Sequence, residues 1–409
     1  MDGLHLGVPA GARPAATDLP RPAPDAFPPS RAEALARIAA IDVGAYERSR
    51  NHLDGAVTRL SPYLTHGVVS VPEVIAAVLA RGASERDKIV FELAWREYWQ
   101  HVWRHLGDGI FRSTRAEPAR ADRYATTLPA DLLEARTGVP AIDAAVRELY
   151  ASGYIHNHAR MWLAAYLVHV RKVRWQTGAA WLHGHLLDGD LASNSLSWQW
   201  VAGTFASKPY LFNNDNVARY APALARPGTA IDRSYEALER LARSGEALGP
   251  EADAPVRGVP VPALTLAPPV DAGASLPRLA GQRVALVHPW MLGQRPECDV
   301  AIGILHVPYH RRFAWSARRW TFVLSLMRPL TDTVWVGDIG NLRSVLAEAR
   351  EVNTVETLAP GYREALAHLA TRAAPAPRYF PDPPKLMRSF SQFWTAHGPG
   401  RLQTAPRAA

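Results

Sequence analysis

The stretch from Asp188 to Trp200, DGDLASNSLSWQW, holds two carboxylates and two tryptophans in thirteen residues. Aspartates at a helix start accept hydrogen bonds from free N–H groups and suit the helix dipole, so the stretch predicts a capped helix. Asn194 and Trp198 are four residues apart and share a face of that helix, whereas Trp198 and Trp200 are two apart and point to nearly opposite sides. This spacing lets one tryptophan line an internal pocket while the other meets an outer cavity. The simpler alternative is that both tryptophans are buried in the hydrophobic core.

A calcium-binding loop is the metal alternative for this stretch, because such loops also begin with D-x-D and an amide or acid. The sixth position of that loop requires Gly and the twelfth Glu, whereas Ser193 and Gln199 stand there. We therefore predict no metal ion here. The single cysteine, Cys298, also excludes a disulfide framework and a cysteine-ligated cluster, which fits a reducing compartment.

The length and charge of the chain suggest two domains and an anionic partner. A chain of 409 residues is long for one hydrophobic core. The net charge of +8 is typical of proteins that bind nucleic acid, although an Arg-rich coding bias explains it equally well. We find no apolar run near the roughly 20 residues of a membrane span and no signal peptide pattern at the start.

Periodicity divides the chain into a helical part and a mixed part. Residues 1–30 are rich in Pro and Ala and predict a disordered arm. Residues 31–220 predict helices, because apolar residues recur at spacings of three and four. The clearest helical runs are 72–82, 87–107, 142–153 and 156–175, with Gly82, Gly107 and Gly153 at expected helix ends.

The second half of the chain changes character after a linker. Residues 221–280 combine a helix at 232–245 with a Pro-rich stretch and predict a linker. Residues 281–399 alternate short β-rich runs with helical ones and predict a small, parallel, Rossmann-like α/β domain; residues 400–409 form a tail. The β-rich runs are 283–290, 299–307, 332–338 and 352–358, and the helical runs are 318–330, 341–351 and 362–371. No glycine-rich phosphate loop follows the first strand, so no nucleotide site is predicted there.

A second group of functional candidates lies on the helix at 87–107. Glu92 and Trp95 are three residues apart and Trp95 and Trp99 four apart, so the three side chains share a face. A carboxyl beside an aromatic surface suits a flat, hydrogen-bonding ligand such as a base. The alternative is an ordinary amphipathic helix in which Glu92 pairs with Arg96.

A third group follows Gly153 in the segment GYIHNHARM. Asn157, Arg160 and Met161 share a face, and an inward-pointing arginine requires a carboxylate, for which Asp188 or Asp190 is the candidate. Two histidines that flank Asn157, His156 and His158, diverge on a helix, so we interpret them as facing solvent rather than as a metal pair.

A fourth segment, Thr58-Arg-Leu-Ser-Pro-Tyr63, offers hydroxyls and free N–H groups to an anion at a turn into a helix that starts with Pro62. Such caps usually have a structural role alone, so the segment by itself is a weak indication of a phosphate site.

Taken in chain order, these segments resemble the FAD-binding domain of the DNA photolyase/cryptochrome family. The resemblance covers about residues 45–220, roughly half of the chain. The motifs that carry it are TRLSPYLTHGVVS, ELAWREYWQH, TGVPAIDAAVREL, GYIHNHARM, the W-x-x-G-x-x-W at Trp175–Trp181, and DGDLASNSLSWQW followed by KPY and FN.

The resemblance implies a U-shaped FAD in a helical bowl. Arg160, Asp188 and Asp190 would surround the isoalloxazine, with Arg160 and Asp188 paired, and Asn194 would face its N5 atom and tune its redox state. The residues that would contact the ribityl chain or the phosphates are Tyr46, Thr58, Leu60 and Ser61.

The resemblance also implies light-driven repair of cyclobutane pyrimidine dimers by electron transfer from reduced FAD. Trp95 and Trp200 would flank a flipped-out dimer, and Glu92 would hydrogen-bond its base edge. Asn157 and Met161 would line the same cavity, where (6-4) photolyases carry histidines.

Photoreduction of the flavin in this family uses a chain of aromatic residues. Trp198 matches its proximal member and Trp175 its middle member. No tryptophan lies between Trp103 and Trp162 for the usual outer member, so Tyr124 would take that place or the electron would leave through another aromatic such as Trp162.

The domain order departs from the family, whose members normally carry an α/β antenna domain before the FAD domain. Only about 45 residues precede the match here, so we expect residues 281–399 to be a displaced antenna-like domain, with the antenna chromophore unassigned.

The expected partner is DNA containing pyrimidine dimers, and no membrane partner is expected. We expect the protein to be a monomer in the bacterial cytoplasm, associated with the nucleoid. The rival functions are a cryptochrome-like FAD photoreceptor without repair activity and a non-catalytic FAD- or DNA-binding module.

Overall fold

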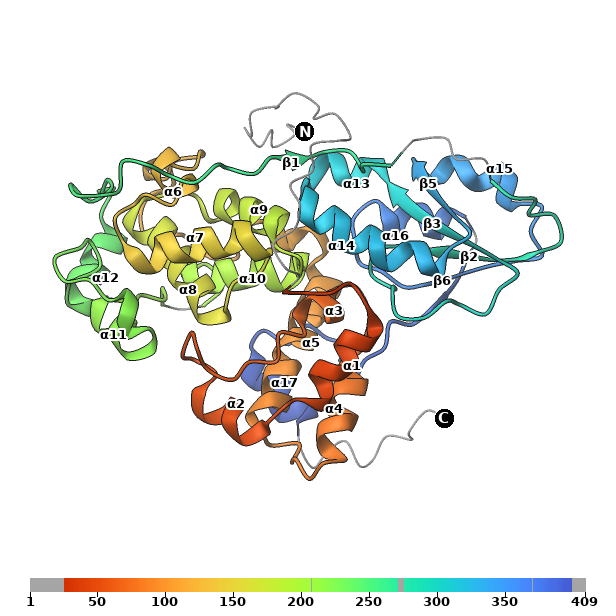
Figure 1. Cartoon of the computed structure of the whole chain (residues 1–409), viewed down its shortest axis with the longest axis horizontal. Coiled ribbons are helices and arrows are strands. Elements are labelled where there is room, and N and C mark those ends of the chain that lie inside the picture. The colour runs from red at the N-terminus through yellow and green to blue at the C-terminus, as the bar shows by residue number, and fades with distance from the viewer. Residues whose placement is uncertain (1–25, 207, 271–275, 370, 399–409) are drawn as a thin grey trace.

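A computed structural model describes residues 26–206, 208–270, 276–369 and 371–398 of the chain. Of the arm expected over residues 1–30, residues 1–25 lie outside these ranges, as does the tail over 400–409. Figure 1 shows three parts: the helices α1–α5, a bundle formed by α6–α12, and a sheet with its covering helices.

Helices dominate the chain up to residue 243, as the periodicity predicts. The helices of this half are α1 (Arg31–Ala39), α2 (Val43–Ser49), α3 (Ser61–Thr65), α4 (Val71–Leu79), α5 (Lys88–Leu106), η1 (Gly107–Phe111), η2 (Ala121–Arg123), α6 (Ala130–Leu133), α7 (Pro140–Ser152), α8 (Asn157–Ala165), η3 (Tyr166–Val170), α9 (Trp175–His185), α10 (Leu191–Ala202), α11 (Asn214–Tyr220), η4 (Pro222–Leu224) and α12 (Tyr235–Arg243). Gly107 and Gly153 end α5 and α7 with positive φ angles, and Gly82 follows the end of α4, which confirms the expected helix ends.

The single helix predicted over 156–175 is wrong in its second half. It consists of α8 and a π-helical turn, η3, which ends at Val170. Lys172 then takes a positive φ of 49°, and Val173 bridges to Ala125 before α9 begins at Trp175. The buried ion pair of Arg171 with Asp131 draws this part of the chain toward α6, so tertiary contacts override the helical pattern.

The segment expected as a linker runs along the helical bundle. The Lys172 Nζ atom donates to the last carbonyls of α12, at Leu241 and Ala242, at 2.7 and 2.9 Å. The backbone N–H groups of Leu248 and Val259 bond to carbonyls of η3 and of the residue after α6. Strand β1 (Leu264–Thr265) then pairs with β4 (Trp315–Ser316) and connects the helical bundle to the mixed part.

The mixed part contains a five-stranded parallel sheet, with the order β5-β3-β2-β6-β7. Its strands are β2 (Arg283–Val287), β3 (Val300–His306), β5 (Thr333–Gly337), β6 (Glu351–Val355) and β7 (Arg372–Ala374). Four of them match the predicted β-rich runs, while β7 is too short and exposed to show a pattern. The connection between β2 and β3, residues 288–299, contains no helix.

The helices of the mixed part are α13 (Val307–Arg312), α14 (Ala317–Met327), η5 (Arg328–Leu330), η6 (Ile339–Leu342), α15 (Arg343–Leu346), α16 (Tyr362–His368) and α17 (Phe390–His397). The helical run predicted over 341–351 is correct only to residue 346, because residue 351 begins strand β6. Helix α17 lies apart from the sheet and beside α5 in Figure 1, although it falls within the range 281–399 expected for the α/β domain. No helix within the described ranges is long and apolar enough to cross a membrane.

The carboxyl end of β2 packs against the helical part. The His66 ring, at the end of α3, lies between the carbonyl oxygens of Pro289 and Leu187, at 2.7 and 2.9 Å. The Leu292 N–H donates to the His66 carbonyl at 2.8 Å. Gly67 is required here, because a Cβ atom would lie 2.5 Å from the Trp290 carbonyl oxygen. The sheet therefore docks directly beside the loop that leads into α10.

Candidate functional site

The loop between α9 and α10 carries the two aspartates of the opening stretch. Asp190 caps α10, since its Oδ1 atom accepts a hydrogen bond from the Ser193 N–H at 2.8 Å. Its Oδ2 atom accepts from Gln100 on α5, also at 2.8 Å. The predicted capped helix is therefore present, and the loop is tied to α5.

Asp188 makes the ion pair that was expected for Arg160. The two side chains meet at 2.8 Å, with exposed fractions of 3% for Asp188 and 23% for Arg160. Burial opposes the charge of Arg160, but Asp188 outweighs this effect and the pKa of the guanidinium is raised. The second oxygen of Asp188, Oδ1, is buried without a hydrogen-bond donor among the described residues. An acceptor in that state favours a ligand that brings an N–H group.

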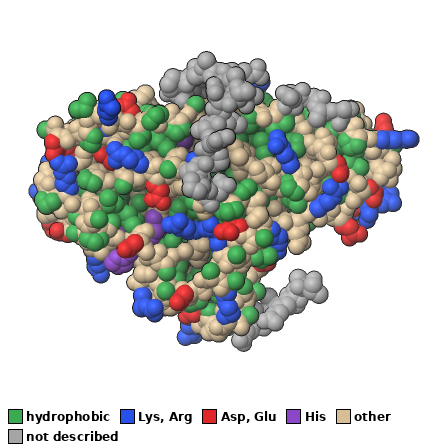
Figure 2. Space-filling model, in the orientation of Figure 1, with side chains coloured by type: hydrophobic (Ala, Val, Ile, Leu, Met, Phe, Trp, Pro, Cys, Tyr) green, Lys and Arg blue, Asp and Glu red, His purple; other side chains and the backbone are tan. Residues whose placement is uncertain are grey.

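Glu92, on α5, has two basic partners. Arg50, at the end of α2, and Lys88, one turn earlier on α5, each lie 3.2 Å from its Oε1 atom. The alternative partner, Arg96, instead donates to Thr65. Burial and the nearby Glu92 charge raise the pKa of Tyr46, which places the Tyr46 hydroxyl in the same group. Figure 2 shows basic, acidic and histidine side chains gathered where the upper-left bundle meets the lower helices.

An aromatic wall adjoins Glu92. The Trp95 and Trp99 ring centroids are 5.1 Å apart, as their shared face predicts. The ring of Phe390, on α17, stacks on Trp95 at 4.0 Å with an interplanar angle of 10°. One face of Trp95 is thereby covered, and Trp95 stays half-buried overall. Phe390 was not anticipated, since it lies almost 300 residues away in the sequence.

Helix α8 presents the third predicted group. Asn157 is exposed and its Nδ2 atom lies 4.0 Å from the Met161 sulfur, so the two residues share a face as expected. The interpretation of His156 and His158 as solvent-facing is wrong, because both are buried. The His156 ring caps α8 by accepting from the His158 N–H, and the His158 ring packs on Trp162 and Tyr220.

The two tryptophans of α10 point to different surroundings. Trp198 is buried against α9, where a Cβ atom on Gly178 would lie 2.4 Å from its ring. Trp200 is half-buried and its ring centroid lies 5.6 Å from that of Tyr210. Asn194 donates to the Ala179 carbonyl at 2.8 Å.

Two further aromatics of the expected electron path are also buried. The Trp175 Nε1 atom donates to Ser113 at 2.9 Å, while the Tyr124 hydroxyl accepts from the Ala119 N–H at 3.3 Å. Both belong to the same hydrophobic cluster as Trp198.

The turn before α3 holds the remaining predicted residues. Thr58 and Ser61 are half-buried and Leu60 is fully buried. Arg59, between them, adopts a positive φ of 49°, which is uncommon for a residue with a side chain. Its charge, together with that of Arg160, lowers the pKa of Glu148 on α7, but partial desolvation of this carboxyl is the larger effect and its pKa is raised. The turn therefore lies on the same side of the bundle as Arg160.

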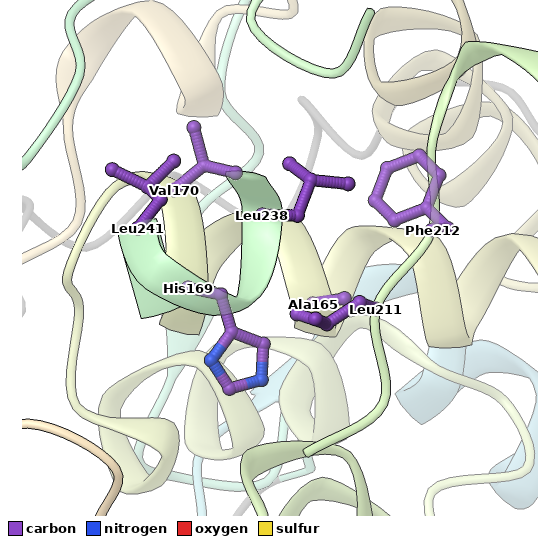
Figure 3. A pocket seen from close by; sticks show the side chains of 7 residues that line it. All are labelled: Ala165, His169, Val170, Leu211, Phe212, Leu238 and Leu241. Atoms are coloured by element: carbon purple, nitrogen blue, oxygen red, sulfur yellow. The ribbon is translucent and has the colours of Figure 1, made fainter. Parts of the chain in front are cut away.

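Two other features of the described residues have the outward form of a binding site. A hollow under α12, lined by Ala165, His169, Val170, Leu211, Phe212, Leu238 and Leu241, has a volume of about 10 Å³ (Figure 3). That volume suits a single water molecule, so it holds no organic cofactor.

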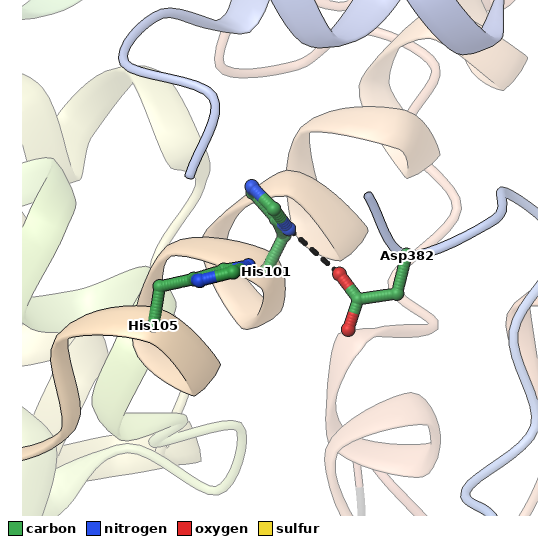
Figure 4. A group of neighbouring side chains, drawn as sticks. All are labelled: His101, His105 and Asp382. Carbon is green, nitrogen blue, oxygen red and sulfur yellow. Dashed lines mark hydrogen bonds and ion pairs between the residues drawn. The ribbon is translucent and has the colours of Figure 1, made fainter. Parts of the chain in front are cut away.

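His101, His105 and Asp382 form the second feature, a cluster with metal-ligating side chains (Figure 4). His101 Nδ1 lies 2.6 Å from Asp382, and its Nε2 atom accepts from the Met387 N–H at 2.9 Å, so both ring nitrogens are used. Arg104, at 2.8 Å, neutralises the other oxygen of Asp382. The cluster therefore fastens the C-terminal segment to α5 instead of holding an ion.

Comparison with known proteins shows what this part of the chain is similar to. Residues 89–243 match the family model described as the FAD binding domain of DNA photolyase. A deoxyribodipyrimidine photo-lyase of Streptomyces griseus is 35% identical over 219 residues, which are 49% of this chain and 47% of that protein. A cryptochrome DASH of Idiomarina loihiensis is 33% identical over 174 residues, which are 40% of this chain and 38% of that protein.

The solved structures that resemble the chain include an archaeal photolyase from Sulfolobus tokodaii with two FAD molecules. Its TM-score is 0.41 at 25% identity, and the match covers 57% of this chain and 52% of that one. The chain spans about half the length of the curated relatives it matches.

Proposed function

We propose that the protein repairs cyclobutane pyrimidine dimers in DNA by light-driven electron transfer from reduced FAD. The proposal is supported by the match of residues 89–243 to the FAD binding domain of DNA photolyase and by the similarity to a deoxyribodipyrimidine photo-lyase. The observation that carries the proposal is the position of Glu92 and Trp95 on α5, a helix that is tied by Gln100 to Asp190. Asp190 belongs to the same loop as Asp188, the partner of Arg160.

The residues at the α9–α10 loop fit a flavin. Asp188 Oδ1 and Ser193 Oγ are buried without partners among the described residues, and a flavin ring offers both N–H and carbonyl groups to them. A buried polar atom left unpaired costs about 1–3 kcal/mol, so its pairing with a cofactor favours binding. Arg160, Asp188, Asp190 and Asn194 would surround the ring, and Tyr46, Thr58, Leu60 and Ser61 would hold the ribityl chain and phosphates.

Residues of the helices α5, α8 and α10 would bind the two joined pyrimidine bases. Trp95 and Trp200 would stack against a flipped-out dimer, and Glu92 would accept hydrogen bonds from its base edge. Asn157 and Met161 would line the remaining side. The surrounding arginines, among them Arg50, would attract the DNA backbone.

Reduced FAD, when bound and excited by light, supplies one electron that breaks the two cyclobutane C–C bonds of the dimer and then returns, so that the reaction has no net redox change. The protein orients the dimer, excludes water and supplies the charges that stabilise the transferred electron. Trp198, Trp175 and Tyr124 would carry electrons from the surface to the flavin before repair. The packing of Trp198 on Gly178, one turn from Trp175 on α9, supports the first step of that path.

A second candidate function is a photoreceptor that binds FAD but does not repair DNA. The observation that favours it is the ring of Phe390, which covers one face of Trp95. It also agrees with the presence of cryptochrome DASH proteins among the relatives.

Illumination of the protein with pre-reduced flavin and an oligonucleotide containing one dimer tests the proposal. We expect light-dependent loss of the dimer, and a strong decrease in the Glu92→Ala variant without loss of FAD. Glu239→Ala, which removes an exposed partner of Arg243 on α12, is the matched control and is expected to repair normally. Bound FAD without any repair would support the photoreceptor, and equal repair by Glu92→Ala would refute the role of Glu92.

A further inference from the structure

Arg319, on α14, is a fully buried arginine that joins the α/β part to the candidate flavin site. Its Nη1 atom donates to the His183 carbonyl at 2.8 Å, and its Nη2 atom donates to the Gly189 carbonyl at 2.6 Å. His183 lies in the last turn of α9, where carbonyl groups lack helical partners. Gly189 lies between the two aspartates of the loop. One guanidinium therefore holds both ends of the connection from α9 to Asp190.

The charge of Arg319 has no carboxylate in direct contact among the described residues. Burial lowers its pKa to about 10, while Tyr309, Asp188 and Asp190 raise it from a longer distance, so the group stays charged at neutral pH. Its guanidinium lies over the Trp315 ring, 4.1 Å from the centroid, and its Nε atom has no hydrogen-bond partner. A buried charge with so few partners is costly, so its retention calls for a role beyond packing.

The loop itself is shaped for this contact. A Cβ atom on residue 189 would lie 2.3 Å from Arg319 Nη1 and 2.5 Å from the His183 carbonyl oxygen, so only glycine allows the guanidinium to approach. The neighbouring Asp188 makes the ion pair with Arg160, and Asp190 caps α10. A shift of the Gly189 carbonyl would therefore move both carboxylates.

We propose that Arg319 is a positioning residue for cofactor binding: the α/β part supplies this arginine to fix the loop Asp188–Asp190, so that the helical part binds FAD tightly only with the α/β part docked. The inference rests on the proposed binding of FAD at this loop, and not on DNA repair. In this proposal the α/β part contributes to the flavin site through Arg319, and this role does not require the α/β part to bind an antenna pigment.

The test uses the full chain with Arg319→Met, Arg319→Lys and, as a matched control, Arg328→Met, which removes an exposed arginine just after α14. FAD is removed and titrated back, and amide hydrogen exchange of residues 186–193 is measured in the flavin-free protein. Loss of two charged hydrogen bonds predicts FAD binding at least about tenfold weaker, and faster exchange in the loop, for Arg319→Met. Arg319→Lys, which keeps the charge and a donor group, is expected to recover part of the FAD affinity and part of the protection of the loop from exchange. Arg328→Met is expected to behave as the wild type in both measurements.

Wild-type FAD affinity together with wild-type loop exchange in Arg319→Met would overturn the inference. If Arg319→Met does not fold, Arg319→Lys and Gly189→Ala, which disturb the same contact from opposite sides, decide the question by the same two measurements. A wild-type protein that binds no FAD would refute the proposed function, whereas loop exchange in the flavin-free protein still reports on Arg319. The two failures are therefore distinguishable.

Discussion

Replacement of Asp188 by Asn removes one charge from the Arg160–Asp188 pair with little change of shape. Arg160 keeps its hydrogen bond to the Ile155 carbonyl and its contact with the Tyr154 ring, but loses the carboxylate that lies 2.8 Å away. A fully buried pair broken in this way costs about 3–5 kcal/mol. Because Arg160 is 23% exposed and water replaces part of the lost interaction, we expect a loss of about 1.5–3 kcal/mol in the free energy of unfolding.

The same substitution also weakens the acceptor Oδ1, which we assign to the flavin. Because the carboxylate oxygen Oδ1 would accept an N–H group of FAD, its replacement by an amide oxygen should lower FAD affinity by about ten- to a hundredfold, which corresponds to about 1.4–2.7 kcal/mol of binding free energy. Urea unfolding of the flavin-free protein and FAD titration separate the two effects. Asp131→Asn, which breaks the pair with Arg171 away from the loop, is the control and should lose stability while keeping FAD affinity. Unchanged FAD affinity in Asp188→Asn would show that Asp188 only supports the fold.

Three shorter predictions concern the aromatic residues and pH. Phe390→Ala removes the stack on Trp95 and should weaken binding of dimer-containing DNA about two- to tenfold without loss of FAD; tighter binding would mean that Phe390 blocks the cavity. Trp198→Phe should slow photoreduction of oxidised flavin but should leave repair by pre-reduced flavin unchanged. If Trp162→Phe slows photoreduction and Trp198→Phe does not, the electron path runs through Trp162 instead. Burial lowers the pKa of His288 to about 4, so its folded form binds a proton less readily than the unfolded chain and stability should fall as pH drops from about 6.5 to 4. A urea midpoint that is constant over this range would contradict that.

Local spacing was sufficient to predict the contacts made within one or two helices. An inward arginine needs a carboxylate, which predicts Asp188 or Asp190 as the partner of Arg160, and the family resemblance selects Asp188. The shared face of Trp95 and Trp99 follows from helical geometry. The strands over 283–306 were equally clear, since buried parallel strands read as continuous apolar runs.

Contacts between distant segments were not predictable from the same patterns. Arg50 was missed as a partner of Glu92 because α2 meets α5 only in the folded chain. His158 is buried because Tyr220 of α11 packs against its ring, which no local rule reveals. No local pattern distinguishes Arg319 from a surface arginine, because its partners, the carbonyls of His183 and Gly189, are at least 130 residues away in the sequence.

The attachment of α17 to α5 has a consequence for how the protein is made. His101 on α5 and Asp382, in the segment that leads to α17, are 281 residues apart, so at about 5–20 residues per second the ribosome needs about 15–60 s between them. During that time the apolar side of α5, with Trp95 and Tyr98, lacks its final cover from Phe390 and Phe393. The packing around the helix that bears Glu92 is therefore completed late in synthesis. Until then the nascent chain exposes an aromatic surface of the kind that chaperones bind.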